Sequence, residues 1–98
     1  MPRYRTRSGV VLTSICGEYV LVAARAIRDK VPKFAQLNES SAFLWRLLES
    51  GSDEAALEKA VMEEYEIEDP ALARSAIEEF VLQMTKSGYL LKEGEEHE

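Results

Sequence analysis

The stretch that decides the fold is QLNESSAFLWRLLESG, residues 36–51. It reads as a helix with both ends marked. Asn38 is suited to cap the N-terminus, because its side-chain oxygen can accept a backbone N–H that the first turn leaves unpaired. Gly51 is suited to close the C-terminus, since glycine adopts a left-handed conformation without steric cost. Apolar residues recur between them at helical spacing, so we expect a central core helix; they are Phe43, Leu44, Trp45, Leu47 and Leu48.

Three short strands are predicted before this helix. Residues 10–16 and 19–25 are rich in β-branched and aromatic residues, and Gly17 between them indicates a hairpin turn. Residues 26–33 are charged and predict a loop. Residues 34–37 then form a short third strand that leads directly into the helix cap.

Two further helices follow. Ser52 is placed to cap the second helix, with the acidic residues 53–54 favourable at the positive end of its dipole. Asp69 and Pro70 mark the start of the third helix, and Gly88 marks its end. The order predicts an α+β fold that is winged helix-turn-helix-like, with a three-stranded antiparallel sheet followed by a three-helix bundle.

At 98 residues the chain is one domain. We expect a flexible basic arm over residues 1–8, a folded domain over residues 9–92 and an acidic tail over residues 93–98. The single cysteine, Cys16, excludes an internal disulfide and fits a reducing compartment. No apolar run is long enough to span a membrane, so we expect a cytoplasmic protein with no membrane partner.

Charge is distributed unevenly along the chain. Residues 1–33 hold seven Lys/Arg against two Asp/Glu, whereas residues 34–98 hold five against sixteen. An acidic helical half repels phosphate, so nucleic acid is not an expected partner.

No constellation for catalysis or cofactor binding is present in the sequence. The only histidine, His97, lies in the acidic tail, so the folded part has no histidine base for a catalytic triad. There is no glycine-rich phosphate loop, and Cys16 and His97 do not form a metal-ligand set. We therefore expect no enzyme activity, no metal and no cofactor, and a function in binding.

The short third strand offers a binding site, because its outer edge would present unpaired backbone groups that an extended peptide can complete. The third helix is the natural second wall of the cleft. We expect five of its residues to turn toward the flank or solvent: Arg74, Glu78, Val81, Leu82 and Thr85. At least one of Val81 and Leu82 should line the groove, unless Leu82 packs under residues 89–90. On this arrangement Val81→Glu would keep the fold and weaken peptide capture.

The sequence resembles the PqqD family in three places. These are the strand at residues 19–22, the segment at residues 37–48 followed by Gly51, and the end of the third helix at residues 80–84 with Gly-Tyr-Leu at 88–90. The resemblance implies the winged helix-turn-helix fold. It further implies a stand-alone recognition element that binds the leader segment of a ribosomally synthesised precursor peptide and presents it to a modifying enzyme.

In that family the leader adds as a strand beside the third strand, in the cleft with the third helix. The partner enzyme would be a radical enzyme, a protease or a cyclase, and the product pyrroloquinoline quinone, a lasso peptide or another modified peptide. The Asn38 motif would have a structural role at the corner between strand and helix. Carried over to this chain, the peptide-binding residues are Phe34, Ala35, Gln36, Leu37, Arg74, Ile77, Glu78, Val81, Leu82 and Thr85.

Two other hypotheses belong to different classes. A winged-helix DNA-binding protein would need a basic recognition helix, but Arg74 and Lys86 on the third helix are balanced by two glutamates, Glu78 and Glu79. A structural adaptor would dock a partner protein through the basic N-terminal third without any leader peptide.

Overall fold

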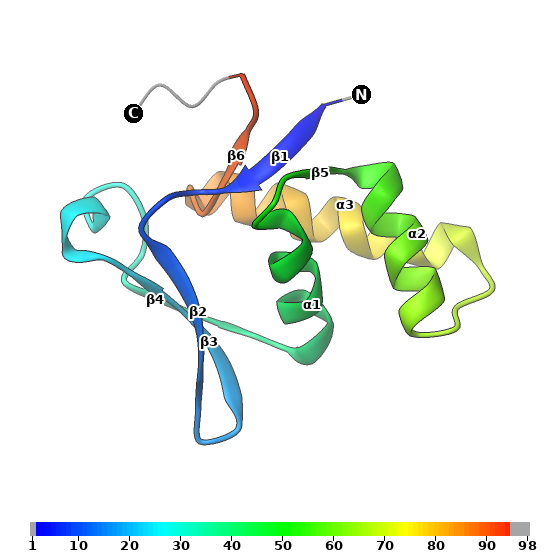
Figure 1. Ribbon diagram of the computed structural model, residues 1–98, viewed down its shortest axis with the longest axis horizontal. Helices are drawn as coiled ribbons and strands as arrows, with labels where there is room; N and C mark the ends of the chain where they lie inside the picture. The colour runs from blue at the N-terminus through cyan, green and yellow to red at the C-terminus, as the bar shows by residue number, and fades with distance from the viewer. Residues whose placement is uncertain (1, 95–98) are drawn as a thin grey trace.

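Three α-helices and two small antiparallel sheets make up the fold, which the computed structural model describes over residues 2–94 (Figure 1). In chain order the elements are β1 (Arg3–Thr6), β2 (Val10–Ile15), β3 (Glu18–Ala23), the 3-10 helix η1 (Arg25–Ile27), β4 (Phe34–Leu37), α1 (Glu39–Leu48), β5 (Ser52–Asp53), α2 (Glu54–Glu64), α3 (Pro70–Ser87) and β6 (Leu90–Lys92). The predicted winged-helix-like α+β fold is confirmed.

The predicted three-stranded sheet has the order β2-β3-β4. Its hairpin turns at Cys16 and Gly17, whose φ angles of 52° and 81° both lie in the left-handed region. This pair of angles is typical of the tight two-residue hairpin turn. Because β2 ends at Ile15, Cys16 belongs to the turn, where it is exposed, rather than to the strand that the sequence predicts.

The second sheet, in the order β5-β1-β6, was not predicted. The basic segment at residues 1–8 was expected to be a flexible arm, and this expectation is wrong for Arg3–Thr6, which forms the central strand. The segment is fixed further by Arg7, whose amide donates to the Tyr89 carbonyl at 2.8 Å and whose Nε donates to the Gly88 carbonyl at 2.7 Å. The partners of β1 lie some 50 and 90 residues away, where no local pattern can point to them.

The corner between β4 and α1 forms as its sequence predicts. The Asn38 side chain accepts a hydrogen bond from the Ser41 amide at 2.8 Å, which satisfies one N–H of the first turn. Trp45 is completely buried, and its ring meets the Tyr89 ring edge-on at 6.4 Å between centroids. The segment at 36–51 therefore connects the sheet to the middle of the core.

The other helix caps agree with the sequence except at two positions. The C-cap of α1 is Glu49 and not the predicted Gly51, which follows two residues later with a φ of 87°. Asp69 caps α3 by accepting from the Ala71 amide at 3.0 Å, and Gly88 ends it with a φ of 88°. The cap of α2 is Asp53, which accepts from the Ala56 amide at 2.8 Å, and not the predicted Ser52. Ser52 is drawn into β5 by its pairing with Tyr4 of β1, and it is buried.

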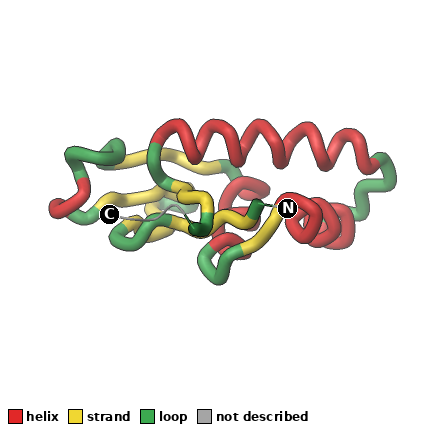
Figure 2. The backbone as a smooth tube through the Cα atoms, turned by 90° about the horizontal axis from the view of Figure 1, so that it is seen from above, coloured by secondary structure: helices red, strands yellow, loops and turns green. Residues whose placement is uncertain are grey.

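The long helix α3 extends along one side of the molecule, with both sheets and the shorter helices on the other side (Figure 2). The loop before β4 is tied to its end, because the Tyr89 hydroxyl donates to the Pro32 carbonyl at 2.6 Å. No helix within residues 2–94 combines the length and the hydropathy needed to cross a membrane. Most of the predicted acidic tail, including His97, lies outside the described residues.

Candidate functional site

The outer edge of β4 is open. In its sheet β4 pairs only with β3, and the C-terminal strand β6 pairs with β1 in the other sheet. The chain's own residues 90–92 therefore do not occupy this edge. Among the described residues, no other strand lies beside β4.

The register of the sheet identifies which backbone groups face outward. Ala23 donates its amide hydrogen to the Lys33 carbonyl at 2.9 Å, and the pairs that follow are Leu21 with Ala35 and Tyr19 with Leu37. In an antiparallel pair, alternate residues turn both backbone groups toward the same neighbour. Lys33, Ala35 and Leu37 therefore face β3, whereas the N–H and C=O groups of Phe34 and Gln36 face the open edge.

A groove of about 430 Å³ lies between this edge and α3. Its floor is apolar and comes from three elements, with Leu37 at the end of β4, Leu44 on α1 and Phe80 on α3. Polar side chains line its rim. The residues around the groove are Gln36, Leu37, Asn38, Ser40, Ser41, Leu44, Ala76, Glu79, Phe80, Gln83 and Met84.

Of the predicted strand residues, Gln36 and Leu37 line the groove, and Phe34 and Ala35 precede them on the same edge strand. Leu37 is 7% exposed and Phe34 is 56% exposed, which fits side chains that alternate between the core and the outer face. The β4 half of the predicted site is thus assembled in one place.

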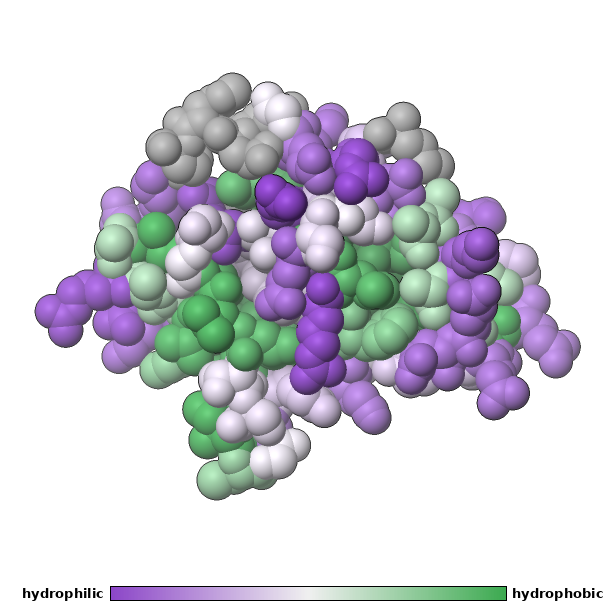
Figure 3. Space-filling view, viewed as in Figure 1, coloured by the Kyte–Doolittle hydropathy of each residue, from purple (hydrophilic) through white to green (hydrophobic). Residues whose placement is uncertain are grey.

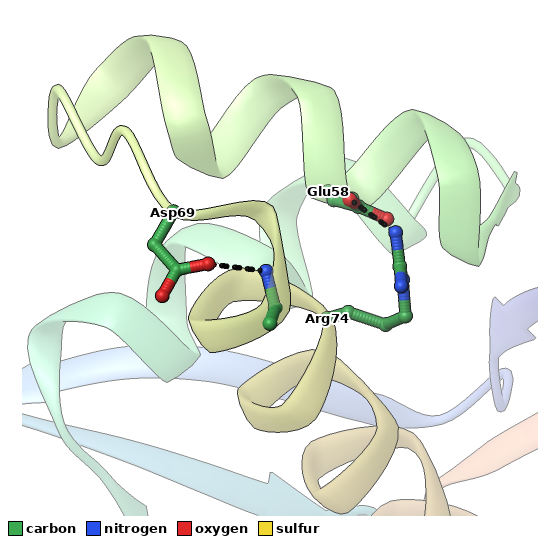
Figure 4. Close-up of polar contacts among 4 residues, drawn as sticks. Glu58, Asp69 and Arg74 are labelled. Atoms are coloured by element: carbon green, nitrogen blue, oxygen red, sulfur yellow. Dashed lines mark hydrogen bonds and ion pairs between the residues drawn. The ribbon is translucent and has the colours of Figure 1, made fainter.

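The α3 half of the predicted site is rotated away from this groove. Arg74, Ile77 and Glu78 line a separate recess beside α2, together with Pro2, Glu54, Ala55 and Glu58. Arg74 forms an ion pair there with Glu58 of α2 at 3.3 Å (Figure 4). The face of α3 that meets the β4 edge is formed instead by Ala76, Glu79, Phe80 and Gln83.

Both Val81 and Leu82 were predicted to turn toward the flank or solvent, and this is wrong for Val81. Val81 is 4% exposed and belongs to the core, as does Ile77, whereas Leu82 is 59% exposed. Leu82 therefore does not pack under residues 89–90, and Val81 cannot line a surface groove. Thr85 is half-buried, and its hydroxyl donates to the Val81 carbonyl at 2.7 Å within the helix.

The reason for this error is that α3 is covered on more than one side. It packs against α2 and the C-terminal strand β6, so its buried residues form a broad stripe of Ala73, Ile77, Phe80 and Val81. A helical repeat with this many apolar positions does not reveal which flank faces the sheet edge. The small residue at Ala76, one turn before Phe80, is the one local signal for the groove wall.

The outer face of the β2-β3-β4 sheet is unusually apolar. The register places Val11, Val22 and Phe34 side by side across the three strands, and Val11 is 61% exposed. The Lys33 amine lies over the Phe34 ring, 5.1 Å from its centroid. Hydrophobic residues gather over this part of the molecule in the space-filling view (Figure 3). A strand added at β4 would extend this face.

The site consists of an unpaired strand edge beside a groove with an apolar floor. Residues 2–94 contain no group of histidine, cysteine and carboxylate side chains that could hold a metal ion. What the open edge and the groove can do is pair with an extended backbone and accept its side chains.

Comparisons with known proteins give the family of this chain and structures that share its fold. Two solved structures superpose on the chain with a TM-score of 0.70 each: a lasso peptide synthetase B1 complexed with the leader peptide, and TbiB1 in complex with the TbiA(beta) leader peptide. They are 23% and 21% identical in sequence, cover 90% and 92% of this chain, and are themselves covered to 96% and 95%. The search of curated proteins gives no match. The model of coenzyme PQQ synthesis protein D matches residues 18–90, about three quarters of the sequence, and the chain therefore belongs to the PqqD family.

Proposed function

We propose that this chain captures the leader segment of a ribosomally synthesised precursor peptide by strand addition at β4 and presents it to a modifying enzyme. The observation that carries the proposal is the open edge at Phe34 and Gln36, whose unpaired backbone groups lie beside a groove with an apolar floor. Backbone pairing supplies affinity at such an edge, and the groove selects side chains.

Family membership and the two similar structures support this function. Both of those structures hold a leader peptide, and both share the fold of this chain over nearly its full length. The groove also has the dimensions of a side-chain site, since 430 Å³ accommodates a few peptide side chains but is at the low end for a cofactor pocket.

In this proposal the chain is a non-catalytic cytoplasmic partner, and the chemistry belongs to the enzyme that receives the peptide. A radical enzyme, a protease or a cyclase would fill that role. The exposed thiol of Cys16 at the hairpin turn fits a reducing compartment.

Amide hydrogen exchange tests strand addition at single residues. The ligand is a synthetic peptide with the leader sequence of the precursor encoded beside this chain's gene. In the free protein, the Phe34 and Gln36 amides should exchange quickly and those of Ala35 and Leu37 slowly, because only the latter are paired with β3. Saturating peptide should slow exchange at Phe34 and Gln36 alone. Binding that leaves both amides fast would contradict strand addition.

A proline substitution provides the matched variant. Gln36→Pro removes one outward-facing N–H without removing a hydrogen bond to β3, since edge strands tolerate proline when its nitrogen faces outward. Gln36→Ala removes the same side chain and keeps the N–H. We expect Gln36→Pro to abolish saturable binding in a fluorescence titration and Gln36→Ala to retain it, with similar thermal melts for both. Equal binding by the two variants would count against backbone pairing.

A further inference from the structure

The wall of the β4–α3 groove carries a single charge. Of its lining residues only Glu79 is ionisable at neutral pH, and the others are apolar or neutral and polar. Glu79 is exposed, and it has no ion-pair partner among residues 2–94. Of the two cations of α3, Arg74 is paired with Glu58 on the α2 side, and Lys86 lies in the last turn, about 10 Å along the helix axis from Glu79. The groove therefore offers an unpaired carboxylate to whatever enters it.

The surroundings strengthen this negative character. A recess of about 410 Å³ continues from the groove past Asn38, and its charged lining residues are Glu18 and Glu39, with no cation. The chain from residue 34 onward carries sixteen acidic against five basic residues. The Arg46 guanidinium lies over the Tyr19 ring of that recess, so the clearest charge preference is in the groove itself. There a carboxylate on a peptide strand would meet repulsion from Glu79, whereas an ammonium or guanidinium would meet attraction.

Helix and strand geometry place Glu79 opposite a defined peptide position. In a strand added beside β4, alternate side chains point inward with Ala35 and Leu37, and successive inward positions are about 6.7 Å apart. Glu79 and Gln83 are one turn apart on α3, about 6 Å along its axis. The two spacings nearly match, so a peptide strand that runs along α3 sets two successive inward side chains against Glu79 and Gln83.

We infer that the leader peptide carries a lysine or arginine at the inward-facing position opposite Glu79, and an uncharged side chain two residues away opposite Gln83. This inference rests on the proposed function, because it describes the peptide that the same groove selects. Glu79 is then a specificity-determining residue, which rejects acidic leaders by repulsion and favours basic ones by pairing.

The test is a selection from a displayed library of short random peptides against three forms of the protein. These are the wild type, Glu79→Lys and the control Glu78→Lys, which makes the same change in net charge one residue away, on the recess beside α2. Wild type and Glu78→Lys should enrich a basic residue at one position of the selected strands. Glu79→Lys should lose this preference or enrich an acidic residue there.

The affinity of one selected peptide then gives the size of the charge preference. Replacing its basic residue by glutamine should weaken binding to the wild type by about two- to fivefold, the range of a solvent-exposed ion pair. The same replacement should leave binding to Glu79→Gln unchanged, and added salt should reduce the difference for the wild type.

Failure of this inference and failure of the proposed function would give different results. Peptides that protect the Phe34 and Gln36 amides but show no charge preference, or the same preference with Glu79→Lys, would overturn the inference and leave the proposed function standing. Failure to enrich any peptide that protects these two amides would overturn both.

Discussion

At the scale of one residue, Val81 contributes to the stability of the core and not to the binding groove. Its side chain is 4% exposed in the core, whereas the adjacent Leu82 is 59% exposed. Val81→Glu should therefore destabilise the protein by more than about 2 kcal/mol, because a carboxylate without a partner would be taken out of water. Leu82→Glu introduces the same side chain and should change the free energy of unfolding by less than about 0.5 kcal/mol.

Urea denaturation followed by circular dichroism measures both variants. A stable, folded Val81→Glu protein would mean that the exposed and buried faces of α3 are assigned wrongly. That outcome would restore the surface position for Val81 that its sequence context suggests.

Tyr89 joins the end of α3 to the loop before β4. Its hydroxyl donates to the Pro32 carbonyl at 2.6 Å, and burial raises the pKa of this phenol above its usual value of 10.0. The unfolded chain therefore loses this proton at a lower pH than the folded chain does. The stability that the raised pKa of Tyr89 contributes is fully present below about pH 10 and is lost as the pH rises above that value. The protein should therefore become less stable at alkaline pH.

Tyr89→Phe separates the two effects of this hydroxyl. At neutral pH the variant should lose about 1 kcal/mol of stability with the hydrogen bond. At alkaline pH its stability should fall less steeply than that of the wild type. The remaining slope includes Tyr65, whose pKa is also raised, first by burial and then by Glu39 and Glu64. Parallel stability curves for wild type and variant between about pH 9 and 11 would contradict this role for Tyr89.

At the scale of the elements, the boundaries that have local signals were predictable. Asn38, Asp69 and Gly88 mark helix ends through contacts within a few residues, and the structure has all three in these roles. The hairpin at Gly17 is equally local. The β4 edge could also be anticipated, since the outer edge of the third strand presents unpaired backbone groups unless another element covers it.

The α3 wall of the site was not predictable in the same way. Which flank of a helix meets a strand edge depends on how the helix is rotated in the assembled core, and the apolar stripe of α3 is too broad to fix that rotation. The prediction selected Arg74 and Glu78, which the structure places beside α2. The groove wall consists of Ala76, Glu79 and Gln83, which lie about 150° away around the helix axis.

A bulky substitution on α3 tests this rotation. Ala76 lies on the groove and is exposed, so Ala76→Phe should fill the groove and weaken leader binding by at least about tenfold, or 1.4 kcal/mol. Ser75 is the preceding exposed residue and does not line the groove. Ser75→Phe should bind as the wild type does. Isothermal titration with the leader peptide distinguishes the two, and equal weakening would show that the ring disturbs α3 itself.

At the scale of the whole molecule, β1 holds the first and last parts of the fold together. Removing residues 2–7 should reduce stability by about 3 kcal/mol or more, since β5 and β6 each pair only with β1 and several backbone hydrogen bonds would be lost. A control with Arg3 and Arg5 replaced by threonine keeps the strand. It loses only the surface ion pair between Arg3 and Glu93, 3.4 Å long, which should matter little.

Thermal unfolding of the truncated chain and of the control shows whether β1 stabilises the fold. Equal melting temperatures would mean that the segment is the dispensable arm suggested by its basic composition. The composition misled because alternating arginines resemble a solvated tail, while their strand partners lie at the opposite end of the sequence.

The pairing of β1 with β6 also bears on how the protein matures on the ribosome. Tyr4, Arg5 and Thr6 leave the exit tunnel more than eighty residues before their strand partners at residues 90–92. The hairpin and α1 are free to form early, but this sheet has to wait until residues 90–92 have been translated. A nascent chain stalled before Leu90 should therefore remain open to proteases at its N-terminus, and release of the last strand should close it.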